Sequence, residues 1–171
     1  MASIILEKVL SKCGHLLAYL PLKICDDKRL VMIAAGGKPP ILKHASNRLQ
    51  ADKELVIFIV WKYGPELRDA LPEFKSDIDV VSVAVNQTGW ALMYASPEMR
   101  SNKDIVKLAY KNDMIAIKYA SNELREDIEF ITELMQYNGL GLQFLSADMR
   151  SNPDIIAAAV NSCELASIFA L

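Results

Sequence analysis

The feature that most constrains this chain is a short segment that recurs with a 25-residue period. Three copies of it are Tyr94–Arg100, Tyr119–Arg125 and Phe144–Arg150, and each begins 25 positions after the one before. Looser copies lie one and two periods earlier, at Asp69–Lys75 and His44–Gln50. A fixed period of this length is typical of arrays whose units stack on one another. The sequence therefore predicts a chain of stacked repeat units.

Other positions repeat with the same period. Each unit carries an acidic residue and then a pair of large apolar residues, and the acidic positions are Glu54, Asp79, Asp104, Glu129 and Asp154. A glycine follows in three of the units, at Gly64, Gly89 and Gly139. The first forty residues fit these columns more loosely, and the last unit is incomplete. We expect residues 1–171 to form a single repeat domain of about seven units.

A capping residue precedes the longer helix that we expect in each unit. These residues are Asp52, Asp77, Asn102, Asp127 and Asn152. Asp and Asn side chains at an N-cap accept hydrogen bonds from the first helical turn. Ser76, Ser101 and Ser151 lie one residue earlier, so a capping box shifted by one residue is an equal alternative. The glycine column fits a C-terminal cap with positive φ. Each unit is thus predicted as a helix, a tight turn, a short helix and a second turn.

One segment, Leu55–Val60, has by itself the composition of a buried strand, because it is rich in β-branched residues. The matching segments Ile105–Tyr110 and Ile155–Val160 have the spacing of a helix face and contain good helix formers. Helices this short cannot bury an apolar face alone, so neighbouring units must stack. The predicted fold class is all-α, with tandem 25-residue two-helix repeats stacked as an α-solenoid or a superhelical bundle.

Composition and charge exclude several classes of protein. A content of 52% hydrophobic and 23% charged residues is typical of a folded globular chain. A net charge of -2 argues against nucleic-acid binding, which usually requires a basic excess. No apolar run reaches the length that a membrane helix requires. Cys13, Cys25 and Cys163 share no short spacing, which indicates reduced thiols in a cytoplasmic protein.

No group of residues indicates catalysis, a metal or a cofactor. His15 and His44 are the only histidines, and neither has a cysteine or carboxylate at ligand spacing. Gly36–Pro40 lacks the spacer and the hydroxyl residue of a phosphate-binding loop, and we expect an irregular turn there. The carboxylates recur as columns, whereas a glycosidase pair stands alone. We expect a protein that is not an enzyme and that binds no cofactor or metal.

One basic residue recurs in each of four units, at Lys75, Arg100, Arg125 and Arg150. Such a column suggests phosphate tracking, as in RNA-reading repeats. Acidic residues stand two positions before each basic residue and four positions after it, so the column is largely neutralised. We interpret these residues as structural, forming Arg–carboxylate pairs and capping carbonyl groups between units.

The best candidates for partner contact are large side chains that depart from their columns near one inter-helix turn. They are Trp61, Lys62, Tyr63, Tyr110, Lys111 and Tyr137. Aromatic residues dominate the energetics of protein interfaces. The alternative is that Trp61 and Trp90 fill the core.

The repeated pattern resembles an uncharacterised family of short helical repeats that is known only as a domain of unknown function. The segment Asp79–Arg100 shows the resemblance best, and it extends over about residues 40 to 160. Members occur in protists, large DNA viruses and effectors of intracellular bacterial pathogens. The resemblance implies helical repeats and a role at a host–microbe interface, and it brings no catalytic residues.

These observations predict a protein-binding helical-repeat module that acts by scaffolding or occlusion, as a bacterial effector or a regulator of one. We expect a cytoplasmic location, including delivery into a host cell, and a protein partner rather than a membrane. Two alternatives stay open. One is a nucleic-acid-binding repeat, and the other is a structural unit that self-assembles through the apolar C-terminal segment Glu164–Leu171.

Overall fold

The computed structural model describes residues 2–37 and 39–171, with side chains from residue 4 onward, and within these ranges the chain is all-helical without a strand. This confirms the predicted fold class at the level of secondary structure. Leu55–Val60, whose composition fits a strand, lies inside helix α5 (Lys53–Lys62). Of the Gly36–Pro40 segment, Lys38 lies outside the described residues.

The described residues form α-helices and 3₁₀ helices in alternation. The α-helices are α1 (Ala2–Leu10), α2 (Leu22–Cys25), α3 (Lys28–Ala34), α4 (Asn47–Gln50), α5 (Lys53–Lys62), α6 (Pro72–Lys75), α7 (Ile78–Gln87), α8 (Pro97–Arg100), α9 (Lys103–Asn112), α10 (Asn122–Glu126), α11 (Ile128–Tyr137), α12 (Ala147–Arg150) and α13 (Pro153–Ser162). The 3₁₀ helices are η1 (Gly14–Tyr19), η2 (Leu42–His44), η3 (Gly64–Asp69), η4 (Gly89–Tyr94), η5 (Met114–Tyr119), η6 (Gly139–Phe144) and η7 (Glu164–Phe169).

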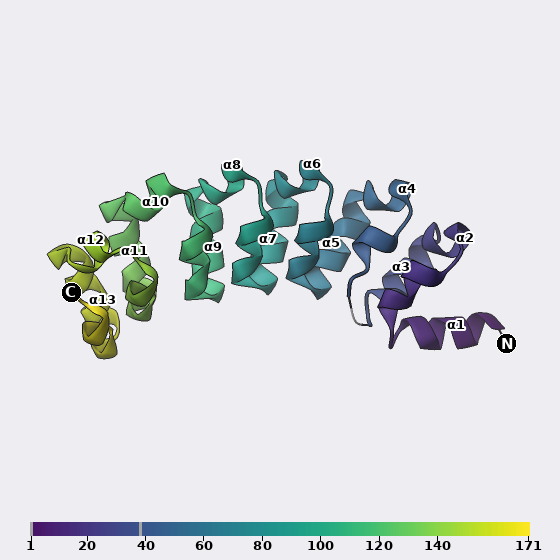
Figure 1. Ribbon diagram of the computed structural model, residues 1–171, viewed down its shortest axis with the longest axis horizontal. Helices are drawn as coiled ribbons and strands as arrows, with labels where there is room; N and C mark the ends of the chain where they lie inside the picture. The colour runs from purple at the N-terminus through teal and green to yellow at the C-terminus, as the bar shows by residue number, and fades with distance from the viewer. Residues whose placement is uncertain (1, 38) are drawn as a thin grey trace.

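From α5 onward the order is a long α-helix, a 3₁₀ helix and a short α-helix. The long helices α5, α7, α9, α11 and α13 have ten residues each, and their first residues are 25 positions apart. Figure 1 shows them in a row, with α4, α6, α8 and α10 along one edge. The opposite edge holds the C-terminal ends of the long helices. A six-residue 3₁₀ helix stands where the sequence predicted only a tight turn.

The long helices begin at the predicted capping residues. Asp52, Asp77, Asn102, Asp127 and Asn152 each accept a hydrogen bond from the backbone N–H three residues later. The alternative with a serine cap is wrong, because Ser76, Ser101 and Ser151 instead follow the C-terminal ends of α6, α8 and α12. The side-chain acceptors satisfy N–H groups that have no partner within the helix.

Ion pairs link the starts of consecutive long helices. Lys28 lies 2.9 Å from the capping carboxylate of Asp52, Lys53 lies 2.7 Å from Asp77, and Lys103 lies 2.7 Å from Asp127. The ammonium groups of Lys28 and Lys103 lower the pKa of Asp52 and of Asp127. Where isoleucine replaces the lysine, at Ile78 and Ile128, the cap that follows is Asn102 or Asn152. A lysine at one helix start is therefore paired with an aspartate cap at the next helix start, and an isoleucine with an uncharged asparagine cap.

The glycine column does not form positive-φ caps, and that prediction is wrong. No glycine in the described ranges has positive φ. Gly64, Gly89 and Gly139 are instead the first residues of 3₁₀ helices. A Cβ atom on Gly89 would lie 2.4 Å from the carbonyl oxygen of Ala109 in the following long helix. Glycine is required there because two backbones approach each other closely.

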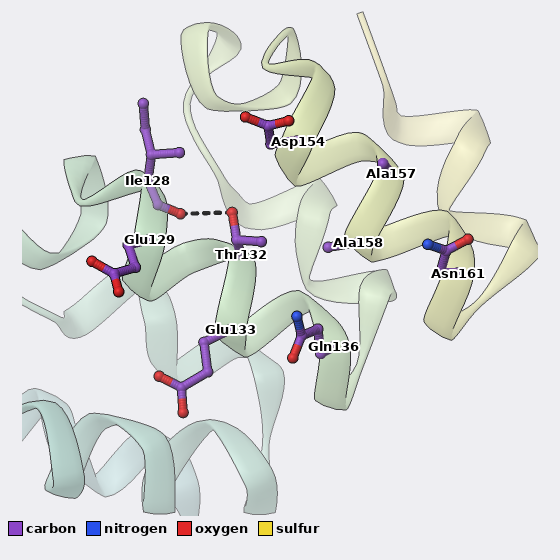
Figure 2. A pocket seen from close by; sticks show the side chains of 9 residues that line it. All are labelled: Ile128, Glu129, Thr132, Glu133, Gln136, Asp154, Ala157, Ala158 and Asn161. Carbon is purple, nitrogen blue, oxygen red and sulfur yellow. Dashed lines mark hydrogen bonds between the residues drawn. The ribbon is translucent and has the colours of Figure 1, made fainter.

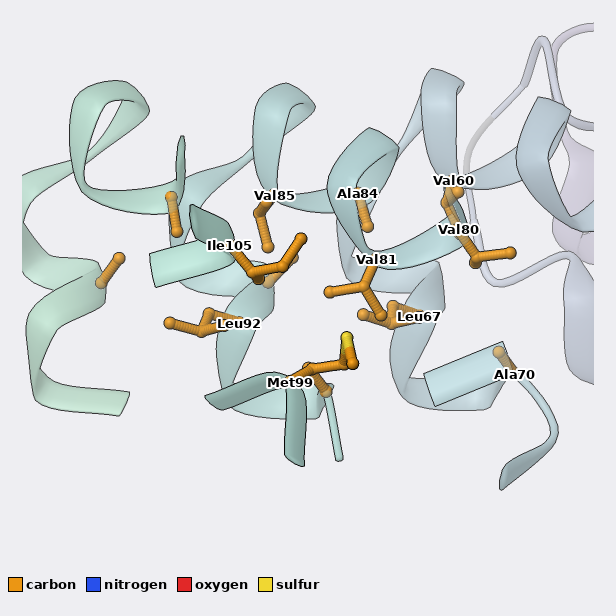
Figure 3. Packing of buried hydrophobic residues seen from close by; sticks show 14 of the residues in the cluster. Val60, Leu67, Ala70, Val80, Val81, Ala84, Val85, Leu92, Met99 and Ile105 are labelled. Carbon is orange, nitrogen blue, oxygen red and sulfur yellow. The ribbon is translucent and has the colours of Figure 1, made fainter. Parts of the chain in front are cut away.

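The core runs along the whole row. Figure 3 shows Val81 of α7, Leu67 of η3, Leu92 of η4 and Met99 of α8 packed together. All four are buried, so α-helices, 3₁₀ helices and short helices of neighbouring units share one apolar interior. Cys13, Cys25 and Cys163 are free thiols, as predicted. Among the described residues, no helix combines the length and the apolar character needed to cross a membrane.

Candidate binding surface at two open joints

Consecutive long helices meet at joints of two kinds. In the first kind, a glycine contacts the backbone of the residue 20 positions later, which is an alanine. The pairs are Gly14–Ala34, Gly64–Ala84, Gly89–Ala109 and Gly139–Ala159. We call these tight joints, because neither residue carries a side chain beyond Cβ.

The same register places Pro39 opposite Ile59 and Met114 opposite Leu134. Large side chains replace both the glycine and the alanine at these two places, which we call the first and second open joints. Packing between α3 and α5, and between α9 and α11, is much less extensive than between α5 and α7. In Figure 1, α11 is turned away from the common direction of α5, α7 and α9. Side-chain volume at this position therefore sets how closely units approach.

A second repeated position, at the end of the long helix, also differs between tight and open joints. At two of the four tight joints the glycine N–H donates to a side chain at the end of the next long helix, from Gly64 to Gln87 Oε1 and from Gly89 to Asn112 Oδ1, each at 2.7 Å. At the open joints the positions equivalent to Gln87 and Asn112 hold Lys62 and Tyr137, whose side chains are exposed. These two side chains are thereby released for other contacts.

At the first open joint a buried carboxylate spans the gap. Glu66 of η3 is only 3% exposed, and its carboxylate accepts hydrogen bonds from the backbone N–H of Ile41 at 3.0 Å and of Leu42 at 2.8 Å. Burial raises the pKa of Glu66, and these N–H groups oppose that shift. Equivalent positions in later units hold Ala91 and Ala116. The Glu66 carboxylate thus accepts hydrogen bonds from two backbone N–H groups at the start of η2, which is shorter than the other 3₁₀ helices.

Two small cavities flank Glu66. One, of about 200 Å³, is lined by Pro39, Pro40, Tyr63, Pro65, Glu66, Arg68, Trp90 and Tyr94. The other, of about 190 Å³, is lined by Ala35, Gly36, Gly37, Pro39, Ile41, Ile59, Lys62, Tyr63 and Glu66. The first is rich in aromatic and proline side chains, which bind apolar or cationic groups.

At the second open joint a tyrosine fills the space. Tyr110 is 2% exposed, and its hydroxyl donates to the carbonyl oxygen of Asn138 in the next unit. Burial raises the pKa of Tyr110. Its ring lies against Gly141, where a Cβ atom would collide with the phenol. A cavity of about 290 Å³ lies beside it and is lined by Tyr110, Lys111, Asn112, Asp113, Met114, Tyr137 and Asn138.

Five of the six predicted contact residues are exposed around these joints. Trp61 is 56% exposed, which excludes the alternative that it fills the core, and Tyr63 is also exposed. The Lys62 ammonium lies 4.3 Å from the centre of the Trp61 ring, and the Lys111 ammonium lies 4.2 Å from that of Tyr137. Tyr110 is the exception, because its buried ring packs the joint itself. The structure places Trp61, Lys62 and Tyr63 at one joint and Lys111 and Tyr137 at the other.

A groove lies between α11 and α13 that the sequence did not lead us to expect. It has a volume of about 890 Å³ and is lined by Ile128, Glu129, Thr132, Glu133, Gln136, Asp154, Ala157, Ala158 and Asn161 (Figure 2). Ala157 and Ala158 occupy the positions that hold Ile57 and Phe58 on α5. This loss of side-chain volume is the sequence signal for the groove. One of its carboxylates, Glu133, pairs with Lys107 at 2.7 Å.

Three of the four residues in the basic column cap carbonyl groups, and the predicted carboxylate pairs do not form among the described residues. Lys75 donates to the carbonyl oxygen of Arg68 at 2.7 Å, and Arg125 and Arg150 donate to those of Lys118 and Phe169 at 3.5 Å. Across residues 2–37 and 39–171 none of the four basic residues forms an ion pair with a carboxylate. The carbonyl groups at the ends of the 3₁₀ helices supply the acceptors instead. Nor does any group of three metal-ligating side chains occur among the residues described.

Comparison with known proteins gives one match. Residues 52–100 and 77–125 each match the family described as Domain of unknown function (DUF4116). The two windows overlap, and together they span residues 52–125. Searches of curated proteins and of solved structures gave no match. The predicted resemblance to a domain of unknown function is thereby confirmed for this central part of the chain.

Proposed function

We propose that the chain is an α-solenoid of 25-residue units that binds another protein. The long helices begin at intervals of 25 positions, and the two family windows are offset by the same number. Such arrays have extended surfaces and commonly serve as binding platforms. In this proposal the chain scaffolds or occludes its partner and carries out no chemistry of its own.

The observation that carries the proposal is where the exposed aromatic side chains lie. Trp61, Tyr63 and Tyr137 are exposed along the edge that holds the ends of the long helices, and Tyr63 and Tyr137 line cavities at the two open joints. At the Gly64–Ala84 and Gly89–Ala109 tight joints the same edge carries polar residues engaged in bonds between units. A partner that contacts this edge would bury aromatic side chains without breaking those bonds.

The family resemblance supports the cytoplasm as the place of action. The resemblance implies related repeats in effectors of intracellular pathogens, so we propose the host cell as one setting. A regulator of such an effector is the other setting consistent with this resemblance.

The test is capture of a partner by the tagged chain from a eukaryotic lysate and from a bacterial lysate, read by mass spectrometry. We expect one protein to be retained stoichiometrically and to be lost with the double variant Trp61→Ala/Tyr63→Ala. Tyr19→Ala is the matched control, because Tyr19 is 81% exposed and lies on η1, which belongs to neither open joint. If the double variant still retains the protein, the binding surface lies elsewhere on the chain. If no protein is retained from either lysate, the proposal is contradicted.

Self-assembly is a second candidate, favoured by the exposed apolar side chains Leu165, Ile168 and Leu171 on and beside η7. Light scattering over a range of protein concentrations tests it. We expect association that increases with concentration and is abolished by Ile168→Lys. A monomer at every concentration would contradict self-assembly.

A further inference from the structure

We propose that the cavity lined by Tyr63, Trp90 and Tyr94 binds a methylated ammonium group, of the kind carried by trimethyllysine, on the partner protein. This inference rests on the proposed protein-binding function and specifies one chemical feature of the partner. Three aromatic rings, a buried carboxylate and the size of the cavity support it.

The rings come from two neighbouring 3₁₀ helices. Tyr63 precedes η3, while Trp90 and Tyr94 belong to η4. The Trp90 and Tyr94 ring centres are 6.1 Å apart and their planes are inclined by 66°, so the two rings form a corner. Pro39 and Pro40, which precede η2, also line the cavity. Aromatic rings arranged around a small space attract cations, and recognition of quaternary ammonium groups by such cages is their main functional use.

The charge of the cavity wall favours a cation. Glu66 lines the cavity, and within the described ranges it has no ion-pair partner. Arg68 also lines the cavity, but its guanidinium group makes two contacts of 3.1 Å with the carboxylate of Asp69. The Arg68 charge is therefore matched mainly by Asp69, and Glu66 is the carboxylate of the cavity wall that forms no ion pair among the described residues.

Several aromatic rings outside this cavity have a lysine of this chain over them. Lys62 covers Trp61, Lys111 covers Tyr137, and Lys118 lies 5.5 Å from the Phe144 ring centre. Among the described lysines and arginines, none covers Tyr63, Trp90 or Tyr94. The cavity is thus lined by three rings over which no described lysine or arginine lies.

The size of the cavity fits one side chain. Its volume of about 200 Å³ equals roughly seven times the share of a water molecule in the liquid, about 30 Å³. A methylated ammonium group with part of its alkyl stem fits such a space, whereas a helix or strand does not. The groove between α11 and α13 is larger and acidic, but no ring lines it.

The test uses fluorescence of Trp90 in the Trp61→Phe variant, which leaves Trp90 as the single tryptophan. The probe is N-acetyl-trimethyllysine methylamide, titrated against its neutral isostere with carbon in place of the ammonium nitrogen. We expect saturable binding of the probe, about fivefold or more weaker binding of the isostere, and similar weakening in Tyr94→Leu and Glu66→Gln. Circular dichroism checks that each variant is folded. If Glu66→Gln is not folded, Tyr63→Leu, at an exposed position, takes its place in the titration.

Equal binding of probe and isostere, or no binding of the probe, would overturn the inference. Capture of a partner in the lysate experiment is read separately. A captured partner with no probe binding would refute the cage and leave the proposed function standing. Probe binding with no captured partner would leave the cage standing and remove the support for a protein partner.

Discussion

Tight and open joints differ in the pair of residues that meet there, and the position three residues beyond the second member of that pair differs as well. Between α7 and α9, Gly89 meets Ala109, and the glycine N–H donates to Asn112. Between α9 and α11, Met114 faces Leu134, Tyr110 fills the interior and Tyr137 is exposed. Two large residues in place of two small ones therefore change the packing, the polar contacts and the accessible surface together. Departures from a repeat can thus locate function, since the regular joints use the same positions for stability.

Shrinking a large residue at the second open joint should have the largest effect. Leu134 is fully buried, and Leu134→Ala should lower the free energy of unfolding by about 3 kcal/mol, measured by urea denaturation. The double variant Met114→Gly/Leu134→Ala copies a tight joint. It should be more stable than the sum of the two single changes predicts, by about 1 kcal/mol, because the units can then close on each other. Strict additivity would show that this pair does not set the spacing.

Enlarging a tight joint should have a slightly smaller effect. A Cβ atom on Gly89 would stand 2.4 Å from a backbone oxygen, and backbone cannot move aside as a side chain can. Gly89→Ala should therefore lower the free energy of unfolding by about 2 kcal/mol. Gly36→Ala is the control, since the nearest atom to its Cβ would be 3.2 Å away, and its effect should stay below about 1 kcal/mol. Similar values for the two glycines would contradict the close-contact explanation.

Removing the carboxylate at the first open joint tests whether Glu66 holds that joint. Glu66→Ala copies Ala91 and leaves the N–H groups of Ile41 and Leu42 without their acceptor. We expect a loss of about 1–2 kcal/mol in chemical denaturation. Glu73→Ala, at an exposed glutamate on α6, should change stability by no more than about 0.5 kcal/mol. If Glu66→Ala is as stable as the wild type, the joint is held by apolar packing alone.

The ion pairs between helix starts should have the smallest effect. Lys103→Ile/Asp127→Asn copies the Ile78–Asn102 pair, and it should reduce stability by less than about 1 kcal/mol at neutral pH. Because Lys103 lowers the pKa of Asp127, the contribution is present above the ordinary value of 3.8 and is lost as the pH falls through the lower folded value. Thermal unfolding at several pH values checks this. A difference that is unchanged at low pH would assign the effect to packing.

The helices and their starts could be predicted from the sequence because their signals are local. Asp52 and Asn102 act within one turn of their own helix, and a repeated column makes such a signal visible several times. The role of Gly89 could not be predicted, since the atom that it must avoid belongs to Ala109, and only the packing of units brings the two together. The burial of Tyr110 could not be predicted for the same reason. An aromatic residue that departs from its column is expected to be exposed, unless the neighbouring joint is wide enough to bury it.

The candidate surface was only partly predictable. Trp61 and Tyr63 are identifiable as large residues at a turn, and the structure shows that they are accessible. Glu66, Trp90 and Tyr94 could not be assigned to a site, because they come from two consecutive units and only the packing of η3 against η4 brings them together. Pairing columns that stand 20 positions apart, with Pro39 against Ile59, would have pointed to this joint.

The residue pairs that link consecutive helix starts also indicate where one 25-residue module ends and the next begins. Each segment that runs from a helical start to the next cap, such as Lys53–Asp77 or Ile78–Asn102, contains both members of its own pair. Gene duplication or deletion of such a 25-residue cassette would carry the pair along intact, whatever its neighbours. The glycine and the alanine of a tight joint, in contrast, belong to different cassettes. The side-chain volumes of the two residues that meet at a joint then decide which cassettes can be neighbours. The ion pair, in contrast, lies within each cassette and is copied with it.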